Sequence, residues 1–316
     1  MAYKYFVDRE AELSALISLI GGELRLIYLY GPRGVGVSSL LQRFVKNIRM
    51  FNNYVVVYID SIEGDKIEYA LTASPRVEEL LRKIAMTSEM PPGRALIYSL
   101  PVALARLGLL NIMGKYIVVI VDHVDRGIGP GRVPDYLDSL KGTANKLLSW
   151  RAAGVTIIGA GTQLGFNALS AYKRGRVGVR RLAGLPFQAY AQLAERLGLK
   201  AEPEKLWRLT GGNPGETIII ATRYRGDISF WRKALAARIR KVVKMIENKG
   251  LVNELSATLR DLDTASEELM KILQAYDLVT RVDAPLLGNK QDTGGKWDWS
   301  LPVYREILSE IVKRKD

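Results

Sequence analysis

A glycine-rich segment with the sequence GPRGVGVS, at residues 31–38, has the composition and spacing of a loop that binds phosphate. It follows the pattern G-x-x-x-x-G-K-[ST], in which glycines let backbone N–H groups turn toward an anion and the following helix adds its positive end. Ser38 stands at the position of the Mg²⁺-binding hydroxyl, but Val37 occupies the lysine position. We therefore expect a phosphate cradle without the cation that normally reaches the β- and γ-phosphates.

The missing cation has a calculable effect on binding. A charge-assisted hydrogen bond contributes about 1.5–3 kcal/mol, so its loss weakens phosphate binding by roughly 10- to 100-fold. Two outcomes stay open: weak nucleotide binding by the backbone alone, or a loop that is only a structural turn. Arg33 is not expected to replace the lysine, because it precedes the last glycine of the pattern by three positions.

A second chemical signal lies downstream in the run IVVIVDH at residues 117–123. An apolar strand that ends in aspartate typically places that carboxylate beside the phosphate loop, so we expect Asp122 to hold Mg²⁺ directly or through water. His123 follows it and is the only histidine of the chain. A histidine could accept a proton near neutral pH, but we interpret this one as an ordinary hydrogen-bonded polar residue.

These residues need a sheet to bring them together. Short apolar runs rich in Val, Ile and Tyr predict strands at Leu24–Tyr30, Tyr54–Asp60, Tyr116–Asp122 and Val155–Gly159. Stretches with helical periodicity separate them, at Ser38–Ile48, Val77–Met86, Ala95–Leu110 and Tyr136–Arg151. This alternation predicts an α/β fold with a parallel sheet. Gly127–Pro134 is rich in glycine and proline and is expected to be a loop.

After residue 184 the pattern becomes helical. Helices are predicted at Pro186–Leu197, Pro203–Thr210, Phe230–Lys249, Leu255–Leu262, Ala265–Tyr276 and Pro302–Val312. A strand pair is expected at Leu278–Asp283 and Lys296–Trp299, joined by the Gly- and Asp-containing stretch Gly288–Gly295. Three helices followed by a β-hairpin are typical of a winged helix.

Several segments together resemble a known family. Phe6–Glu10, the loop Gly31–Leu41, Leu185–Phe187 and the turn Gly211–Pro214 are similar to motifs of AAA-type P-loop ATPases, in particular archaeal ATPases related to the STAND NTPases and to the archaeal origin-recognition initiators. The resemblance covers nearly the whole chain. It implies a five-stranded parallel sheet in the order 5-1-4-3-2 within residues 1–184, a helical lid at 185–245, a winged helix at 246–316, and ATP or ADP with Mg²⁺ as cofactor.

The resemblance also implies roles for individual residues. Ser38 and Asp122 would hold the metal, and Thr162 or Gln163 would act as a polar sensor. Arg174 or Arg176 would reach a γ-phosphate of the same or a neighbouring subunit. The residues that would contact the nucleotide are Gly31, Pro32, Arg33, Gly34, Val35, Gly36, Val37, Ser38 and Ser39.

The same family places a glutamate, which orients the attacking water, at the position of His123. Loss of a general base lowers a rate by roughly 10²–10⁴, and loss of one preorganised donor by a further ~10²–10³. Changes at both Val37 and His123 therefore predict little or no hydrolysis. We keep a slow ATP hydrolase as an alternative.

Composition limits the class of protein and its location. The chain has 316 residues and no cysteine, which excludes disulfides and thiolate metal sites. No apolar run is long enough for a membrane span, so no membrane partner is expected. The first residues, MAYKYFVDREAEL, lack a signal pattern. We therefore expect a cytoplasmic protein.

The net charge of +13 is concentrated in the middle of the chain. Residues 141–200 carry ten basic and one acidic side chains, and residues 222–260 carry ten and three. Such segments suggest a polyanionic partner, although a well-solvated surface has the same composition. Candidate nucleic-acid contacts are Lys173, Arg174, Arg176, Arg180, Arg181, Lys233, Arg240, Lys241 and Lys244. The third helix of the predicted winged helix, Ala265–Tyr276, instead carries Glu267 and Glu268. Their negative charge is the wrong sign for a surface that contacts phosphates.

These observations favour a degenerate AAA-type protein that works as a regulatory or scaffolding module, with a protein partner or a related ATPase subunit. The alternative from another class is a DNA-binding protein of the origin-recognition or STAND type that uses the basic middle segments.

Overall fold

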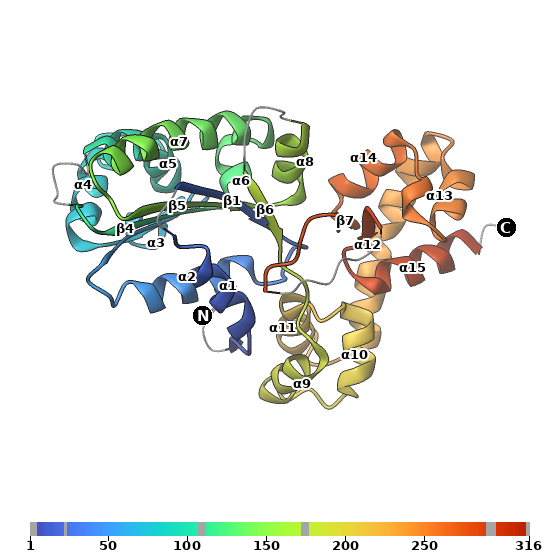
Figure 1. The fold of residues 1–316 in the computed structure, drawn as a ribbon. Coiled ribbons are helices and arrows are strands. Elements are labelled where there is room, and N and C mark those ends of the chain that lie inside the picture. Colours follow the sequence, from blue (N-terminus) through green and yellow to red (C-terminus); the bar gives the residue numbers. More distant parts are fainter. Residues whose placement is uncertain (1–4, 22–23, 107–111, 172–176, 289–294, 314–316) are drawn as a thin grey trace.

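The chain folds into an α/β domain followed by helices and a small β-hairpin (Figure 1). The computed structural model describes residues 5–21, 24–106, 112–171, 177–288 and 295–313. This arrangement confirms the predicted class: a P-loop α/β domain, a helical lid and a C-terminal winged helix. Within the described residues, no helix has both the length and the apolar character needed to cross a bilayer.

The sheet of the first domain has six strands in the order β3-β2-β4-β5-β1-β6. Five strands are parallel, and their order reproduces the expected 5-1-4-3-2, whereas β3 is an antiparallel addition at the edge. The strands are β1 Leu24–Tyr30, β2 Tyr54–Asp60, β3 Leu71–Ala73, β4 Tyr116–Asp122, β5 Gly154–Gly161 and β6 Gly178–Arg181. β3 and β6 were not predicted, because strands of three and four residues contain no apolar run long enough to recognise.

The central strands are buried on both faces, which explains their uninterrupted apolar sequence. One face packs against α4, α5 and α7, and the other against α1 and α2. Figure 1 shows these two helical layers on either side of the sheet. The helices of this domain are α1 Glu10–Ser18, α2 Val37–Ile48, α3 Ile67–Ala70, α4 Pro75–Ala85, α5 Pro92–Arg106, α6 Val124–Ile128, α7 Val133–Ser149 and α8 Gln163–Ala171.

The predicted loop at Gly127–Pro134 is wrong. These residues contain the end of α6, a 3₁₀ turn at Pro130–Arg132 and the start of α7. Gly127 is needed for close packing: a Cβ there would lie 2.5 Å from Ser61 Oγ. The glycine thus reflects contact with the end of β2 and not an irregular backbone.

The second half of the chain is helical, as expected, with one helix that the prediction missed. Its elements are α9 Phe187–Arg196, α10 Pro203–Thr210, α11 Pro214–Thr222, α12 Ile228–Asn248, α13 Val252–Thr258, a 3₁₀ turn Leu262–Thr264, α14 Glu267–Ala275, β7 Val279–Arg281, β8 Trp297–Trp299 and α15 Pro302–Lys313. The missed helix, α11, has recognisable start signals. Asn213 caps it by accepting the N–H of Glu216 at 3.1 Å, and proline follows at the first helical position.

The lid and the C-terminal helices are not separate bodies. The predicted boundary between residues 245 and 246 lies inside α12, whose buried side chains include Trp231 near one end and Ile246 near the other. One hydrophobic core contains Tyr190 of α9, Leu273 of α14 and Ile307 of α15 together with these residues. We call this unit, residues 185–282 and 295–313, the lid–wing body.

Candidate nucleotide site

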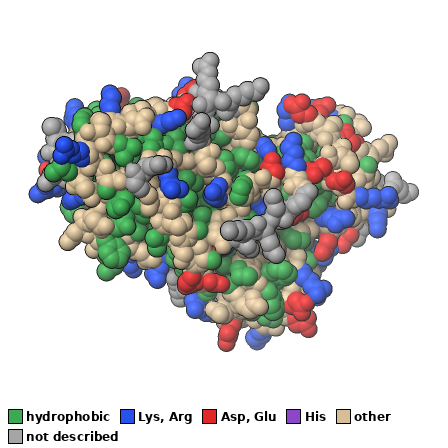
Figure 2. Space-filling model, in the orientation of Figure 1, with side chains coloured by type: hydrophobic (Ala, Val, Ile, Leu, Met, Phe, Trp, Pro, Cys, Tyr) green, Lys and Arg blue, Asp and Glu red, His purple; other side chains and the backbone are tan. Residues whose placement is uncertain are grey.

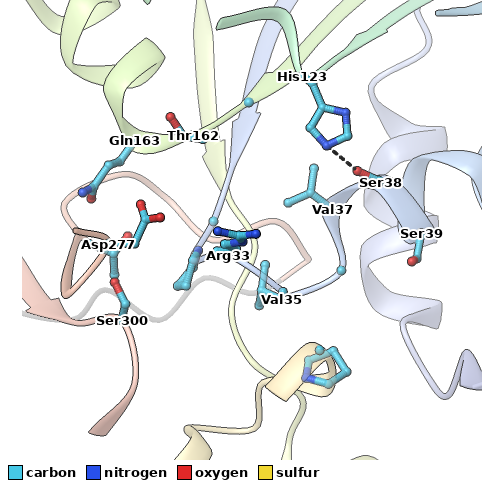
Figure 3. A pocket seen from close by; sticks show the side chains of 18 of the residues that line it. Arg33, Val35, Val37, Ser38, Ser39, His123, Thr162, Gln163, Asp277 and Ser300 are labelled. Atoms are coloured by element: carbon cyan, nitrogen blue, oxygen red, sulfur yellow. Dashed lines mark hydrogen bonds between the residues drawn. The ribbon is translucent and has the colours of Figure 1, made fainter. Parts of the chain in front are cut away.

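A cavity of about 890 Å³ lies at the carboxyl ends of the parallel strands, where ligands bind in open α/β sheets. Its walls include the loop after β1, the ends of β4 and β5, the start of α11, and the part of the chain that follows α12, which we call the C-terminal domain (Figure 3). All nine predicted contact residues, 31–39, line it. Phe6 and Val7 of the predicted N-terminal motif, together with the preceding Tyr5, close another side.

The loop after β1 has the conformation of an anion nest. Gly34 and Gly36 have φ angles of +84° and +102°, which side chains other than glycine rarely adopt. Helix α2 begins at Val37, and the N–H of Leu40 is bonded to Gly36 O at 2.9 Å. Because the N–H groups of a first helical turn have no partner within the helix, those of residues 37–39 are available to an anion.

Contacts from outside hold the loop in this conformation. The lid binds two of its carbonyls: Asn213 Nδ2 donates to Arg33 O at 2.8 Å, and Gly215 N to Gly34 O at 2.9 Å. The buried Arg9 guanidinium donates to Val35 O at 3.0 Å. The carbonyls of residues 33–35 are therefore held by these neighbours. This role of Arg9 escaped the sequence reasoning, which placed it only within an N-terminal motif.

Neither of the loop side chains Val37 and Arg33 places a positive charge beside Ser38. Val37 is half-buried and presents an aliphatic side chain to the cavity. Arg33 is exposed, and Figure 3 shows it facing Asp277 of the C-terminal domain and not Ser38. This arrangement agrees with the expectation that Arg33 does not replace the lysine.

The carboxylate of Asp122 lies at the base of the cavity and is 1% exposed. The Tyr58 hydroxyl donates to its Oδ2 at 2.8 Å, and the N–H of His123 donates to its Oδ1 at 2.9 Å. Burial raises the pKa of Asp122, while the His123 charge and the Ser38 and Tyr58 hydroxyls act in the opposite direction and offset it only partly. The two predicted metal ligands, Ser38 and Asp122, are thus brought together.

The imidazole of His123 lies beside these two ligands. Its Nδ1 is 3.0 Å from Asp60 Oδ1 and its Nε2 is 3.5 Å from Ser38 Oγ (Figure 3). Burial alone would lower the pKa of His123, but the hydrogen bond to Asp60 and the charge of Asp122 outweigh it, so the pKa is raised. The imidazole is therefore held between the Asp60 carboxylate and the Ser38 hydroxyl at the edge of the loop.

Asp60 is a site residue that sequence reasoning did not single out. It ends β2, and in the sheet register it is the direct neighbour of Asp122 on β4. The sequence did contain a signal for it: Asp60 stands at the carboxyl end of a predicted strand, as Asp122 does.

The residues fit phosphate better than they fit a divalent cation. The backbone nest and the start of α2 suit an anion. The position between Ser38 and Asp122, however, adjoins the His123 imidazole, whose Nε2 lies 3.5 Å from Ser38 Oγ and whose acidic neighbours raise its pKa, which works against a second cation there. Within the described ranges, no group of three or more His, Cys, Asp or Glu side chains could hold a metal.

The two sensor candidates have different roles in the structure. Thr162 contacts the site through Asp125: its N–H donates to Asp125 Oδ2 at 2.8 Å, and its hydroxyl donates to the same oxygen. Gln163 is 5% exposed and binds the C-terminal domain, donating to Val279 O at 2.8 Å and accepting from Arg281 N at 3.1 Å. The Thr162 hydroxyl is therefore held by Asp125 beside the cavity, whereas the Gln163 amide is bonded to the C-terminal domain.

The basic residues predicted to contact nucleic acid lie in different environments. Lys173, Arg174 and Arg176 lie outside the described residues. Arg180 is half-buried, and Arg181 is 7% exposed with its backbone bonded to Pro285 and Leu287 of the C-terminal domain. Burial at this junction does not suit Arg181 to nucleic acid, contrary to the expectation. The α12 candidates are all exposed: Lys233, Arg240, Lys241 and Lys244.

Comparison with known proteins gives the family. Residues 6–219 match the model of a family described as an ATPase domain predominantly from Archaea. No curated protein matches the chain in sequence. Among solved structures, the Aeropyrum pernix ORC2 protein in ADPNP and ADP complexes is 15% identical, with a TM-score of 0.43, covering 99% of this chain and 98% of that one. Cdc6p from Pyrobaculum aerophilum is 14% identical, with a TM-score of 0.44, covering 98% of this chain and 96% of that one. The match to the family model spans most of the chain, including the loop, the strand ends and the first lid helices, and the chain belongs to this archaeal ATPase family.

Proposed function

We propose that this chain is a non-hydrolysing member of its ATPase family, which binds adenine nucleotide weakly and acts as a regulatory or scaffolding module for a protein partner or a related ATPase subunit. The observation that carries the proposal is the pair of substitutions in the cavity. Val37 supplies no charge to a polyphosphate, and His123 stands beside Asp122 and Ser38.

The preserved parts of the site support binding. The nest glycines, the start of α2 and the cavity beside them remain, and each contributes independently of the lysine. Phosphate would be held by the N–H groups of residues 36–39, and the lid at Pro214 would cover it. A family member that keeps this architecture but lacks the catalytic charges suits a role in which bound nucleotide changes the conformation of the protein without being hydrolysed.

The Val37→Lys substitution tests the state of the cavity. Because the lysine ammonium would reach the β- and γ-phosphates, we expect the variant to bind ATP about 10- to 100-fold more tightly than the wild type. Isothermal titration with Mg-ATP measures the change, with Val37→Met as an uncharged control of similar length. Equal affinity of the lysine and methionine variants would contradict an intact phosphate site.

Turnover by the wild type would refute the non-hydrolysing assignment. A sensitive phosphate-release assay should give no signal above a matched Asp122→Ala variant. Release that is present in the wild type and absent from that variant would favour the slow hydrolase instead.

A second candidate function, binding of DNA, is favoured by one surface. The four exposed basic side chains of α12, at positions 233, 240, 241 and 244, form no ion pair within the part of the chain that the structure describes. By contrast, acidic side chains gather over α14 (Figure 2), where Glu267 pairs with Lys271 and Glu268 with Lys249. Any contact with DNA should therefore involve α12 and not the wing helix α14.

The DNA candidate predicts a steep dependence on salt. Replacing Lys233, Arg240, Lys241 and Lys244 by glutamine should lower the affinity for a DNA duplex by about tenfold or more at low ionic strength and flatten its salt slope. Fluorescence anisotropy measures both quantities. Absence of duplex binding by the wild type at low salt would exclude this function.

A further inference from the structure

The space between Ser38 and Asp122, the two residues expected to hold Mg²⁺, is called here the metal corner of the cavity. The His123 imidazole lies against it: its Nε2 is 3.5 Å from Ser38 Oγ, and Figure 3 shows the ring directed at that hydroxyl. Magnesium binds oxygen ligands at about 2.0–2.1 Å in octahedral geometry and keeps several of its waters. An ion bound to Ser38 would therefore need, together with its waters, the space in which the imidazole lies.

The imidazole is also a poor substitute for the missing oxygen ligands. Magnesium prefers carboxylate, carbonyl and water oxygens, whereas imidazole nitrogen suits zinc, copper, iron and nickel. For these other metals, the described part of the chain contains no group of three or more His, Cys, Asp or Glu side chains that could hold an ion. His123 therefore lies against the metal corner without making it a site for another metal.

Several contacts hold His123 in this position. Its Nδ1 is 3.0 Å from Asp60 Oδ1, on the side of the ring away from Ser38. Its backbone is left-handed, with φ +52°, and its carbonyl accepts from the Ser61 hydroxyl at 2.6 Å. Because the residue is bonded both at its backbone and at Nδ1, the ring leaves the metal corner only if its contact with Asp60 is broken.

The Asp122 carboxylate is occupied by donors from the protein. Its Oδ2 accepts from the Tyr58 hydroxyl and its Oδ1 from the N–H of His123. Gln42 Nε2 donates to the Tyr58 hydroxyl at 3.2 Å, which fixes that hydroxyl on the carboxylate. Asp122 is 1% exposed, so almost none of its surface is open to a hydrated ion. Asp122 thus accepts hydrogen bonds from the chain at both oxygens that would face the metal or its waters.

The phosphate cradle does not depend on the metal corner. The positive φ angles of Gly34 and Gly36 and the N–H groups of residues 37–39 provide an anion site made of backbone alone. None of these N–H groups takes part in the contacts among His123, Asp60 and Asp122. The chain therefore retains the half of a nucleotide site that binds phosphate, while its own side chains occupy the half that binds metal.

We propose that this cavity binds adenine nucleotide as the metal-free anion, because His123 and Tyr58 occupy the contacts that Mg²⁺ would need. The inference rests on the proposed nucleotide binding and adds the form of nucleotide that is bound. In the usual arrangement, Mg²⁺ bridges the phosphates to the protein and tightens binding. In this chain the ion competes with the cradle for the phosphates, so that Mg²⁺ binding and protein binding oppose each other.

The first test compares isothermal titrations of the wild type with ADP in EDTA and in excess Mg²⁺. We expect Mg²⁺ to leave the affinity unchanged or to lower it. Binding that is more than about threefold tighter in Mg²⁺ would overturn the inference. Absence of binding in both buffers would instead refute the proposed function, and the same two titrations of Val37→Lys, which retains His123, would then decide the inference. Tighter binding of that variant in Mg²⁺ would overturn it, and no binding at all would overturn both.

The second test removes the ring. His123→Asn is introduced in the Val37→Lys background, because asparagine tolerates the left-handed backbone and lacks the Nε2 edge that faces Ser38. With the metal corner open, Mg²⁺ should tighten ADP binding about tenfold or more, the effect of one recovered charge-assisted contact. Asp60→Asn, which keeps the ring but weakens its hold, should give a smaller gain.

The matched control is Asp65→Asn in the same background, which makes the same exchange as Asp60→Asn at an exposed position after β2. It should leave the response to Mg²⁺ unchanged. Circular dichroism verifies that each variant is folded. A His123→Asn variant whose ADP affinity does not rise with Mg²⁺, or a control that gains as much, would overturn the assignment of His123 to the metal corner.

Discussion

The combination of Val37→Lys, His123→Glu and Asp60→Asn is expected to raise the rate of ATP hydrolysis at least about 10³-fold above that of the wild type. The lysine would stabilise charge on the phosphates, and the glutamate would orient water. Phosphate release under saturating Mg-ATP measures the rate, and a fourth change, Asp122→Ala, should abolish it.

The combination includes Asp60→Asn because the Asp60 carboxylate contacts the imidazole of His123 in the wild type. The Asp60 carboxylate lies 3.0 Å from His123 Nδ1, and Asp122 lies 3.8 Å from the same atom. A glutamate introduced at position 123 would lie near the carboxylates of Asp60 and Asp122. Like charges at that distance raise the pKa of the glutamate and favour its neutral acid form. Without Asp60→Asn, we expect about tenfold less activity. A triple variant no faster than the wild type would show that catalysis is blocked elsewhere in the chain.

The Trp231→Ala substitution is expected to destabilise the protein by about 3–5 kcal/mol. Trp231 is 1% exposed in the core of the lid–wing body, and its indole N–H donates to Glu216 Oε2 at 3.0 Å. The alanine variant creates a cavity where helices of the lid and of the C-terminal domain meet. Chemical denaturation followed by circular dichroism measures the loss.

A conservative variant separates packing from hydrogen bonding. Trp231→Phe keeps most of the apolar volume and should cost about 1–2 kcal/mol. Since one core spans the lid–wing body, the lid and the C-terminal helices should unfold together. Loss of less than about 1 kcal/mol in the alanine variant, or a separate transition for each part, would contradict a shared core.

The sequence was sufficient for the parts of the fold that depend on local pattern. β1 and β4 are recognisable because strands buried on both faces need uninterrupted apolar residues. Helix α12 was expected at Phe230–Lys249 from helical periodicity alone. The phosphate loop was placed correctly because its spacing sits between a strand and a helix.

Contacts between distant segments were beyond the sequence. Periodicity shows which face of α12 is buried but not which helices cover it, so a boundary was drawn through a continuous core. The bond between His123 and Asp60 depends on the register of two strands. Gln163 and its partner Arg281 are separated by 118 positions in the chain. No local signal reports such a pairing.

The shared core of the lid and the C-terminal helices has a mechanical consequence. Helix α12 is 21 residues long, which corresponds to about 32 Å at 1.5 Å per residue. It shares a hydrophobic core with the lid, which meets the phosphate loop where Gly215 N donates to Gly34 O. A rotation of the lid–wing body that lifts Pro214 from the loop must therefore carry the cationic side chains of α12 through the same angle, and the displacement of each side chain grows with its distance from the axis of rotation.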